Sequence, residues 1–357
     1  MSRQHHQARR TGRQDVARAA GVSVTTVTHA LNPPPGVRMD PATRDRVRRI
    51  ARELGYRPSF VGRALVAGRS FAVGLLQPTR ATLMYPFYQA ITLGLSEAME
   101  SADYLPLVLF RSAEGRHLRV IRQGRVDGML VLQSERDAAP IREVAATGLP
   151  TVAVNVHYES LPGEASGCVH SDHRRMLCEA VGELVGLGCR RLLVFHDHRV
   201  HDANATLQEA FAAEVARRVG EGITGRTVVP ASGVALAGQC RELFLAEPGW
   251  DGVLVDGARV AEVLVQAGLA LGRVPRRDYR LVVAETDPGR TTSGRWEESV
   301  YAHQPQEVGR SAWRLLSGLM DGSASCREVL VPYRREAIDG QSGAECAPQE
   351  RTDPWHA

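Results

Sequence analysis

The chain has 357 residues, enough for two or three domains, and a net charge of only +4. The charge is uneven: residues 1–70 hold fourteen arginines and four acidic residues, a net +10, which leaves −6 for the remainder. A basic N-terminal region on a mildly acidic body indicates that only the N-terminal region meets a polyanion. No apolar run approaches the roughly 18 residues of a membrane span, and no signal-peptide core is present. A cytoplasmic protein that binds no membrane is therefore expected.

Six cysteines are scattered through the sequence without any CxxC pair. This spacing favours small buried hydrophobic side chains in a reducing compartment over disulfides or a zinc site. No cofactor is expected. The cysteines are Cys168, Cys178, Cys189, Cys240, Cys326 and Cys346.

The first predicted elements are two short helices around a tight turn. Val16, Ala17 and Ala20 share one helical face, and Gly21 ends the helix where a positive φ is needed. Ser23 can then cap a second helix, whose inward-facing residues are Val27 and Leu31.

A third helix is predicted to open with Asp40 as its N-cap and Pro41 at its first position, and to stop at Gly55. Its inward-facing residues are expected to be Val47, Ile50 and Leu54.

A short helix, a glycine-containing turn and a second short helix are typical of the helix-turn-helix motif. Any three-helix bundle would show the same periodicity, but the arginine-rich flanks and the hydroxyl residues at the second helix favour DNA binding. The second helix would enter the major groove by its N-terminus. The predicted base-reading residues are Val24, Thr25 and His29. The predicted phosphate contacts are Ser23, Thr26, Thr28 and Asn32.

Two segments, DVARAAGVSVTTVTHALN (15–32) and TRDRVRRIARELGYRPSFVGRAL (43–65), resemble signatures of the LacI/GalR family of bacterial transcriptional regulators. The resemblance implies a repressor that binds a pseudo-palindromic operator as a homodimer, with a tetramer left open. It also implies a hinge helix from Ser59 to Val66 that folds only on operator DNA. In that helix Leu65 would wedge into the minor groove, with Val61 and Arg63 as further hinge contacts.

The chain departs from the family pattern at three places in the head. His29 replaces the usual arginine near the end of the recognition helix, and Arg13 replaces an apolar residue two before Asp15. The loop after Asn32, PPPGVRM, is longer than is common and rich in proline. The operator sequence therefore cannot be read from the family pattern.

From Phe71 onward, short apolar runs alternate with helical stretches such as 87–100. This pattern is typical of parallel sheets covered on both faces, and two series of runs predict two doubly wound lobes. The fold class expected is an all-α helix-turn-helix head followed by an α/β body of two such lobes, similar to a periplasmic binding protein. The strand-like runs are 71–77, 105–110, 128–132 and 151–155 in one series and 192–196, 252–256 and 281–285 in the other.

The predicted domain boundaries follow from the same patterns. A disordered arm (1–11), the head (12–58), a hinge helix and linker (59–70), the body (71–340) and a disordered tail (341–357) are expected. Lobe 1 would comprise about 71–165 and 291–322, and lobe 2 about 166–290 and 323–340.

The resemblance implies a small-molecule effector in a cleft between the lobes. The residues expected to line it are Tyr85, Phe87, Asn155, Asp172, His196, Asp256 and Gln304. Leu207 and Val255 stand where sugar-responsive relatives are expected to carry Arg and Asn, so an ordinary monosaccharide is disfavoured. For Asp172, Asp256 and Gln304, helix capping and hydrogen bonding between strands remain the alternative to ligand contact.

The segment HDHRVHD (196–202) holds three histidines and two aspartates after a predicted strand. A transition-metal site, polar contacts in the cleft and a solvated loop are three open interpretations, and no standard zinc spacing favours the first. His170 and His173 lie nearby in the sequence and add little to the metal interpretation.

Enzyme activity is not expected, because the sequence contains no Walker loop, no GxSxG and no HExxH motif. A rival to the effector-responsive regulator remains: a regulator of the same fold with a degenerate cleft, which answers to no small molecule or to a protein partner.

Overall fold

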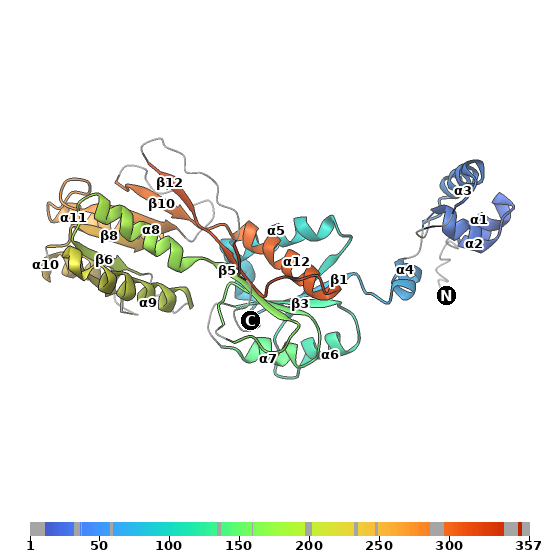
Figure 1. Ribbon diagram of the computed structural model, residues 1–357, viewed down its shortest axis with the longest axis horizontal. Coiled ribbons are helices and arrows are strands. Elements are labelled where there is room, and N and C mark those ends of the chain that lie inside the picture. The colour runs from blue at the N-terminus through green and yellow to red at the C-terminus, as the bar shows by residue number, and fades with distance from the viewer. Residues whose placement is uncertain are drawn as a thin grey trace, which may run out of the picture. The chain divides into compact units, whose positions relative to one another are not determined.

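The computed structural model describes residues 11–31, 36, 38–57, 60–133, 137–158, 160–196, 202–231, 235–246, 249–285, 296–338 and 349–351 (Figure 1). The chain divides into two compact units, Met1–Arg69 and Ser70–Ala357. We call them the head and the body, and each is described by itself.

The head contains a three-helix core. Its helices are α1 (Arg13–Ala20), α2 (Val24–Leu31) and α3 (Pro41–Glu53). Val16, Val27 and Val47, one from each helix, are completely buried against one another. Because the apolar residues of these short helices are few, this shared core rather than helix propensity holds them in place.

The caps of the head helices agree with the sequence prediction. Gly21 adopts φ 64° and closes α1 with its N–H directed at the Ala17 and Arg18 carbonyls. Asp40 caps α3 by accepting a hydrogen bond from the Thr43 N–H at 3.0 Å, and Pro41 occupies the first turn.

The expected inward face of the head needs one correction. Leu54 is 40% exposed, whereas Ala51 is buried in its place. The helix ends at Glu53 and Leu54 is its C-cap, so the side chain no longer follows the helical face that carries Val47. Ile50 and Leu31 are partly buried against the core.

A fourth helix, α4 (Phe60–Ala67), covers most of the predicted hinge and buries none of its eight residues. The helix was expected to begin at Ser59, which lies outside the described residues.

The body contains two sheets, one in each lobe, which confirms the predicted fold class (Figure 1). The strand order of lobe 1 is β13-β11-β5-β4-β3-β1-β2, and that of lobe 2 is β12-β10-β9-β8-β6-β7. Every pairing is parallel except those of β12 and β13. The core of each sheet therefore has the doubly wound order 2-1-3-4-5, which places a switch point between β1 and β3 and another between β6 and β8.

The strands of lobe 1 are β1 (Ala72–Gln77), β2 (Leu105–Phe110), β3 (Gly128–Leu132), β4 (Thr151–Val154), β5 (Ser166–Ser171), β11 (Glu328–Val331) and β13 (Gln349–Arg351). Its helices are η1 (Ala81–Met84), α5 (Pro86–Glu100), α6 (Arg116–Arg122), α7 (Ala139–Ala145) and α12 (Pro305–Asp321). Helices α5 and α12 cover one face of the sheet, and α6 and α7 the other (Figure 1).

Helices α5 and α12 approach each other closely. A Cβ on Gly94 would lie 2.0 Å from the Gln306 carbonyl oxygen, and one on Gly309 would lie 2.1 Å from the Ile91 carbonyl oxygen. Only glycine permits this backbone contact, so the two residues fix how α12 packs on lobe 1.

The strands of lobe 2 are β6 (Arg191–Phe195), β7 (Thr224–Val228), β8 (Gly252–Asp256), β9 (Arg280–Glu285), β10 (Ser299–Ala302) and β12 (Arg334–Ala337). Its helices are α8 (His173–Gly186), α9 (Asp202–Arg217), η2 (Val219–Glu221), α10 (Leu236–Ala246) and α11 (Ala258–Ala270). Apolar residues of α8 and α9 pack on one face of the sheet, and those of α10 and α11 on the other.

The expected lobe boundaries were wrong at all three crossings. Strand β5 belongs to lobe 1, so the chain first crosses at Asp172 rather than near 166. Strand β10 belongs to lobe 2, which moves the second crossing to 303–304, and β11 returns to lobe 1 before the third crossing at 332–333. Strands β5 (SGCVHS) and β10 (SVYA) are short and half polar, so no continuous apolar run marked them.

The tail was expected to be disordered from residue 341. Within it, β13 instead pairs antiparallel with β11, from Glu328↔Arg351 to Leu330↔Gln349. The edge of β11 offers unpaired backbone groups, and a polar segment can satisfy them as well as an apolar one. Residues 1–10 of the predicted arm (1–11) lie outside the described part of the chain, and Thr11 donates a hydrogen bond from its hydroxyl to the Leu54 carbonyl at 3.0 Å.

The five cysteines in the described residues are free, and four of them are buried, as expected. None of the described helices is long and apolar enough to cross a membrane.

Candidate nucleic-acid interface and effector site

The N-terminus of α2 is built by Ser23. Its Oγ accepts a hydrogen bond from the Thr26 N–H at 3.0 Å and lies 2.8 Å from the Thr26 hydroxyl, so Ser23 is the N-cap that the sequence predicted. Ser23, Val24 and Thr25 are exposed, with Val24 at 40%. The end of the helix that should meet DNA is thus preformed and accessible.

The opposite face of α2 anchors it, because Val27 and Ala30 are completely buried. His29 is half-buried on the remaining face. The departure at Arg13 also has a structural counterpart: Arg13 is the first residue of α1, and its Nη1 donates to the Thr28 hydroxyl at 3.4 Å.

The Thr28 hydroxyl donates to the Val24 carbonyl at 3.1 Å. Thr28, Thr26 and Ser23 therefore all have partners within the head, and their phosphate contacts stay predictions. Asn32 lies outside the described residues.

Helix α4 exposes a row of apolar side chains. Val61 is 74% exposed and Leu65 is 83% exposed, and the Arg63 guanidinium lies 5.3 Å from the centre of the Phe60 ring. A helix of eight residues without buried contacts is marginal in water, so α4 requires a partner to be stable.

The predicted effector residues gather at the carboxyl ends of parallel strands. Asn155 follows β4, Asp172 follows β5, His196 follows β6, Asp256 ends β8 and Gln304 follows β10 by two residues. The chain also crosses between the lobes at the carboxyl ends of β5, β10 and β11. Ligands of open α/β sheets bind at these strand ends, nearest the switch points.

In lobe 1 the switch point carries two glutamines that sequence reasoning missed. Gln77 ends β1 completely buried, and no described residue forms a hydrogen bond with its Oε1 or Nε2. Gln133 follows β3, and its carbonyl accepts from the Tyr88 hydroxyl at 3.2 Å and from Asn155 Nδ2 at 3.4 Å. Gln77 could have been suspected as the one polar residue ending an otherwise apolar strand.

Asn155 adopts φ 68°, a left-handed conformation that asparagine tolerates well. Tyr85 is 48% exposed at the N-cap of α5, and Phe87 lies next in the helix. The Phe87 ring packs edge-on against Tyr88 at 5.5 Å and against His303 at 5.1 Å, which ties α5 to the second crossing.

In lobe 2 the switch point carries His196 and Asp256. His196 is completely buried, and neither ring nitrogen has a hydrogen-bond partner in the described part of the chain. Burial lowers the pKa of His196 to about 4. Burying a neutral imidazole without a hydrogen-bond partner costs free energy. A bound ligand or water would remove this cost by forming the missing hydrogen bonds. Leu207, in the position of the expected sugar-binding arginine, is instead buried in the core of lobe 2 beside Phe211.

Two predicted effector residues have structural roles. Asp172 caps α8 by accepting from the Arg175 N–H at 3.1 Å, and Gln304 Nε2 donates to the Pro332 carbonyl at 2.9 Å. Asp172 therefore has the helix-capping role and Gln304 the backbone hydrogen bond that were the alternatives to ligand contact. A ligand contact by either residue remains a prediction.

The three crossings are joined by a hydrogen-bonded chain that the sequence did not reveal. Ser171 Oγ lies 2.9 Å from His303 Nδ1, His303 Nε2 lies 2.6 Å from the Tyr333 hydroxyl, and that hydroxyl lies 2.8 Å from His173 Nδ1. Burial lowers the pKa of His303 to about 3, so its ring is neutral. Burial, followed by the nearby Asp256 and Asp172 carboxylates, raises the pKa of Tyr333 well above its usual value.

Most of the segment 196–202 proposed as a possible metal loop, residues 197–201, lies outside the described residues. A different group of side chains in the described part of the chain has the donors and spacing for a metal ion: His157, Cys168, His170 and Glu328.

These features define a class of protein: a helix-turn-helix head with an apolar hinge helix, followed by a two-lobed body of the periplasmic-binding-protein type. Residues 14–59 match the family model described as bacterial regulatory proteins, lacI family. The head therefore matches the DNA-binding region of the LacI family, as the sequence motifs predicted.

Among curated relatives, the HTH-type transcriptional regulator RegA of Clostridium saccharobutylicum is 34% identical over 149 residues, which cover 40% of this chain and 43% of RegA. The alignments to the first curated relatives span only about half of those relatives, 43–55% of their length.

Two solved structures show that the fold continues through the body. The lac repressor dimer bound to operator and the anti-inducer ONPF has a TM-score of 0.69 at 18% identity, over 92% of this chain and 99% of that one. The complex of the transcriptional regulator CelR with cellobiose has a TM-score of 0.59 at 22% identity, with the same coverage.

Proposed function

We propose that the protein is a sequence-specific DNA-binding transcriptional regulator, acting as a repressor, that binds a pseudo-palindromic operator as a homodimer and responds to a small molecule bound between its lobes. The observation that carries this proposal is α2: its N-terminus is capped and exposed while its opposite face is locked in the head core. This is the geometry needed to insert a helix end into the major groove.

The reading surface would comprise Val24, Thr25 and His29 for bases, with Ser23, Thr26, Thr28 and Asn32 near the phosphates. Around it, the fourteen arginines of residues 1–70 supply the sequence-independent attraction to DNA. Helix α4 would provide the minor-groove contact through Leu65, since its apolar side chains find no partner core in the head.

Exposed apolar residues in lobe 1 support a dimer. Met84 is 77% exposed, Leu93 on α5 is 49% exposed, and Leu105 on the edge strand β2 is 69% exposed. An exposed apolar edge strand beside an exposed apolar helix face is typical of a surface that a second copy covers. Two-fold symmetry of that dimer would place the two recognition helices on two half-sites related by inversion.

Selection of bound sequences from random DNA tests the DNA-binding part. We expect one half-site repeated in inverted orientation, with a spacing near one helical turn or a multiple of it. The matched test of the dimer is sedimentation of Leu105→Glu, which should give monomers and lose affinity for the full operator. An enriched motif without inverted symmetry, or no enriched motif, would contradict the proposal.

The effector part rests on the strand ends. Gln77 in lobe 1 and His196 in lobe 2 are buried without hydrogen-bond partners among the described residues, at the carboxyl ends of β1 and β6 beside the two switch points. Buried polar groups of this kind are normally paired, so a bound ligand or water would complete them. An effector that binds one arrangement of the lobes better than the other would shift the population of that arrangement.

A specific observation also favours the rival regulator without a small-molecule effector. The hydrogen-bonded chain from Ser171 through His303 and Tyr333 to His173 joins all three crossings by the protein's own side chains. Such a chain could hold the lobes in one arrangement without a ligand.

A thermal-shift screen separates the two. An effector at one hundred times its dissociation constant should add about 2.7 kcal/mol to the free energy of unfolding. The screen should cover disaccharides, nucleosides and phosphorylated metabolites, with His196→Leu as a variant that loses the response to a true ligand. Stabilisation by none of these compounds would favour the rival.

A further inference from the structure

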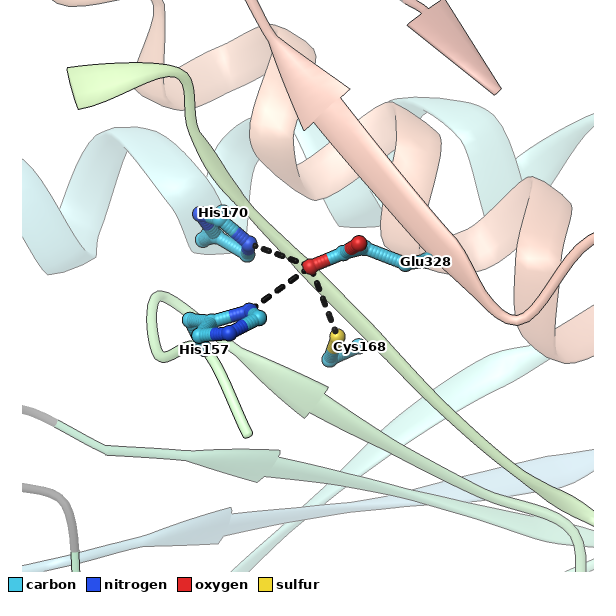
Figure 2. Close-up of side chains that lie close together, drawn as sticks. All are labelled: His157, Cys168, His170 and Glu328. Carbon is cyan, nitrogen blue, oxygen red and sulfur yellow. Dashed lines mark hydrogen bonds and ion pairs between the residues drawn. The ribbon is translucent and has the colours of Figure 1, made fainter. Parts of the chain in front are cut away.

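A second group of polar side chains lies in lobe 1 and takes no part in the proposed effector site. His157, Cys168, His170 and Glu328 each direct one donor atom to a common point, and these atoms all lie within 4.8 Å of one another (Figure 2). They come from three separate stretches of the sequence: the loop after β4, strand β5 and strand β11.

The sheet itself brings these residues together. Cys168 and His170 are two residues apart on β5, so their side chains leave the same face of the sheet. Glu328 is the direct partner of Cys168 in the parallel pairing of β5 with β11. Strand β4 flanks β5 on its other side and delivers His157 three residues after its end.

One oxygen of Glu328 forms the centre of the group. Its Oε1 lies 2.7 Å from His157 Nδ1, 3.1 Å from His170 Nε2 and 4.0 Å from Cys168 Sγ (Figure 2). The cysteine is buried and the side chains of His170 and Glu328 are largely so, while the His157 side chain is 37% exposed. The group is therefore closed on the sheet side and accessible at His157.

The hydrogen bond on the far side of His170 orients the ring. His170 Nδ1 lies 3.0 Å from the Ser171 carbonyl, an atom that can only accept, so Nδ1 carries the proton and donates. In a neutral ring Nε2 then presents a lone pair to a carboxylate oxygen, which also only accepts. Either a second ring proton or a metal ion must then lie between the two, and a carbonyl that accepts from the other ring nitrogen is the arrangement found for histidines that bind metals.

The four donors are one thiol sulfur, two imidazole nitrogens and one carboxylate oxygen. This is the ligand type of four-coordinate zinc rather than of calcium or magnesium, which take oxygen ligands. In a tetrahedral site with bonds of about 2.0–2.3 Å, neighbouring donors stand roughly 3.3–3.8 Å apart. The distances from Glu328 Oε1 to the other three donor atoms, 2.7–4.0 Å, bracket that range. Shifts of the donor atoms of less than about 1 Å would therefore form the site.

We propose that His157, Cys168, His170 and Glu328 bind a divalent transition-metal ion of the zinc type. Two of the three crossings leave lobe 1 from the strands that carry these ligands, at Asp172 after β5 and at Pro332 after β11. A bound ion would join β5 to β11 in addition to their backbone pairing. It would therefore stabilise the two strands from which these crossings leave.

Cobalt titration of the full-length, metal-free protein with a non-thiol reductant tests the site. We expect one equivalent of cobalt per chain, with the visible absorption of a four-coordinate ion and a near-ultraviolet band from thiolate to metal charge transfer. Zinc should displace cobalt and remove both signals. Absence of stoichiometric binding, or binding without the thiolate band, would overturn the proposal.

Variants assign the ligands. Cys168→Ser should lose the thiolate band, whereas Cys178→Ser, which removes another free cysteine, should keep it. His198→Ala should also leave the band unchanged, which separates this site from the histidines of residues 196–202. A band that survives Cys168→Ser would contradict the assignment.

Because Cys168 is buried, its replacement could unfold the body. His157→Ala avoids this difficulty, since that side chain is partly exposed in the loop after β4. It should abolish stoichiometric cobalt binding while the tryptophan fluorescence of the body is retained. Retained stoichiometric binding in this variant would contradict the assignment of His157 as a ligand.

Discussion

Helices α2 and α4 are both eight residues long and similarly hydrophobic on average, yet they differ in how far the head buries them. Helix α2 has Val27 and Ala30 completely buried against α1 and α3, while α4 has no buried residue. The first is therefore a finished reading element before DNA arrives. The second leaves its apolar surface exposed, which agrees with the proposed hinge that folds on its operator.

The largest effect should come from breaking the core that supports α2. Val27→Asp places a charge where the side chain has no solvent contact, which should cost at least about 3 kcal/mol and unfold the head. Binding to operator and to random DNA should both be lost, and trypsin should cut the arginine-rich head rapidly.

The three described tryptophans, Trp250, Trp296 and Trp313, all lie in the body, so their fluorescence is an internal control. It should be unchanged in Val27→Asp, and Val27→Ala should give a graded loss of head stability of about 1.5–3 kcal/mol. A head that resists trypsin in Val27→Asp would show that α2 does not depend on this core.

The second-largest effect should be a loss of operator affinity on changing α4, with the stability of the head unchanged. Leu65→Ala should weaken operator binding by about 1–3 kcal/mol, since the minor-groove contact is lost. Because Leu65 is 83% exposed, trypsin resistance of the head should match that of the wild-type protein. Affinity for random DNA, which depends on charge, should barely change.

Val66→Ala is the matched control for Leu65, because Val66 is 85% exposed on the same helix. It should affect operator binding less. An equal loss on operator and random DNA in Leu65→Ala would remove the distinction between the two helices.

A smaller effect should separate the two roles of Ser23. Ser23→Ala removes the N-cap of α2 and should destabilise the head by about 1 kcal/mol. Ser23→Asp retains a capping oxygen, so stability should be kept, but its negative charge should weaken binding to all DNA. Urea unfolding of the head and DNA binding at several salt concentrations measure the two effects, and wild-type DNA affinity in Ser23→Asp would place Ser23 away from the phosphates.

Features set by neighbouring residues in the sequence could be predicted, whereas features set by contacts between distant segments could not. The ends of α1 and α3 follow from Gly21, Asp40 and Pro41, which act on their own neighbours, so the head was predicted almost completely. The prediction that Leu54 faces the core was wrong, because the helix ends one residue earlier than its apolar pattern suggested.

In the body, the buried apolar strands were found but the crossings were not. Strand β5 carries Cys168 and His170 among polar residues, and its place in lobe 1 depends on pairing with β4 and β11. That register is a property of the assembled sheet, so no local pattern could join Glu328 to His157. The contact of His303 with Tyr333 could not be predicted either, because it also depends on how distant segments pack.

The smallest change in affinity, and the finest test of α2, concerns His29. This half-buried residue stands where the family resemblance implied an arginine, near the end of a helix whose position is fixed by the buried Val27 and Ala30. Since the substitution leaves that core intact, His29→Arg should keep the head stable and total affinity close to the wild-type value. An arginine can bond a guanine through two hydrogen bonds, so the preference at one base position of each half-site should change by about 1–3 kcal/mol. Selection from random DNA with both proteins measures this. An unchanged preference would show that His29 does not contact bases.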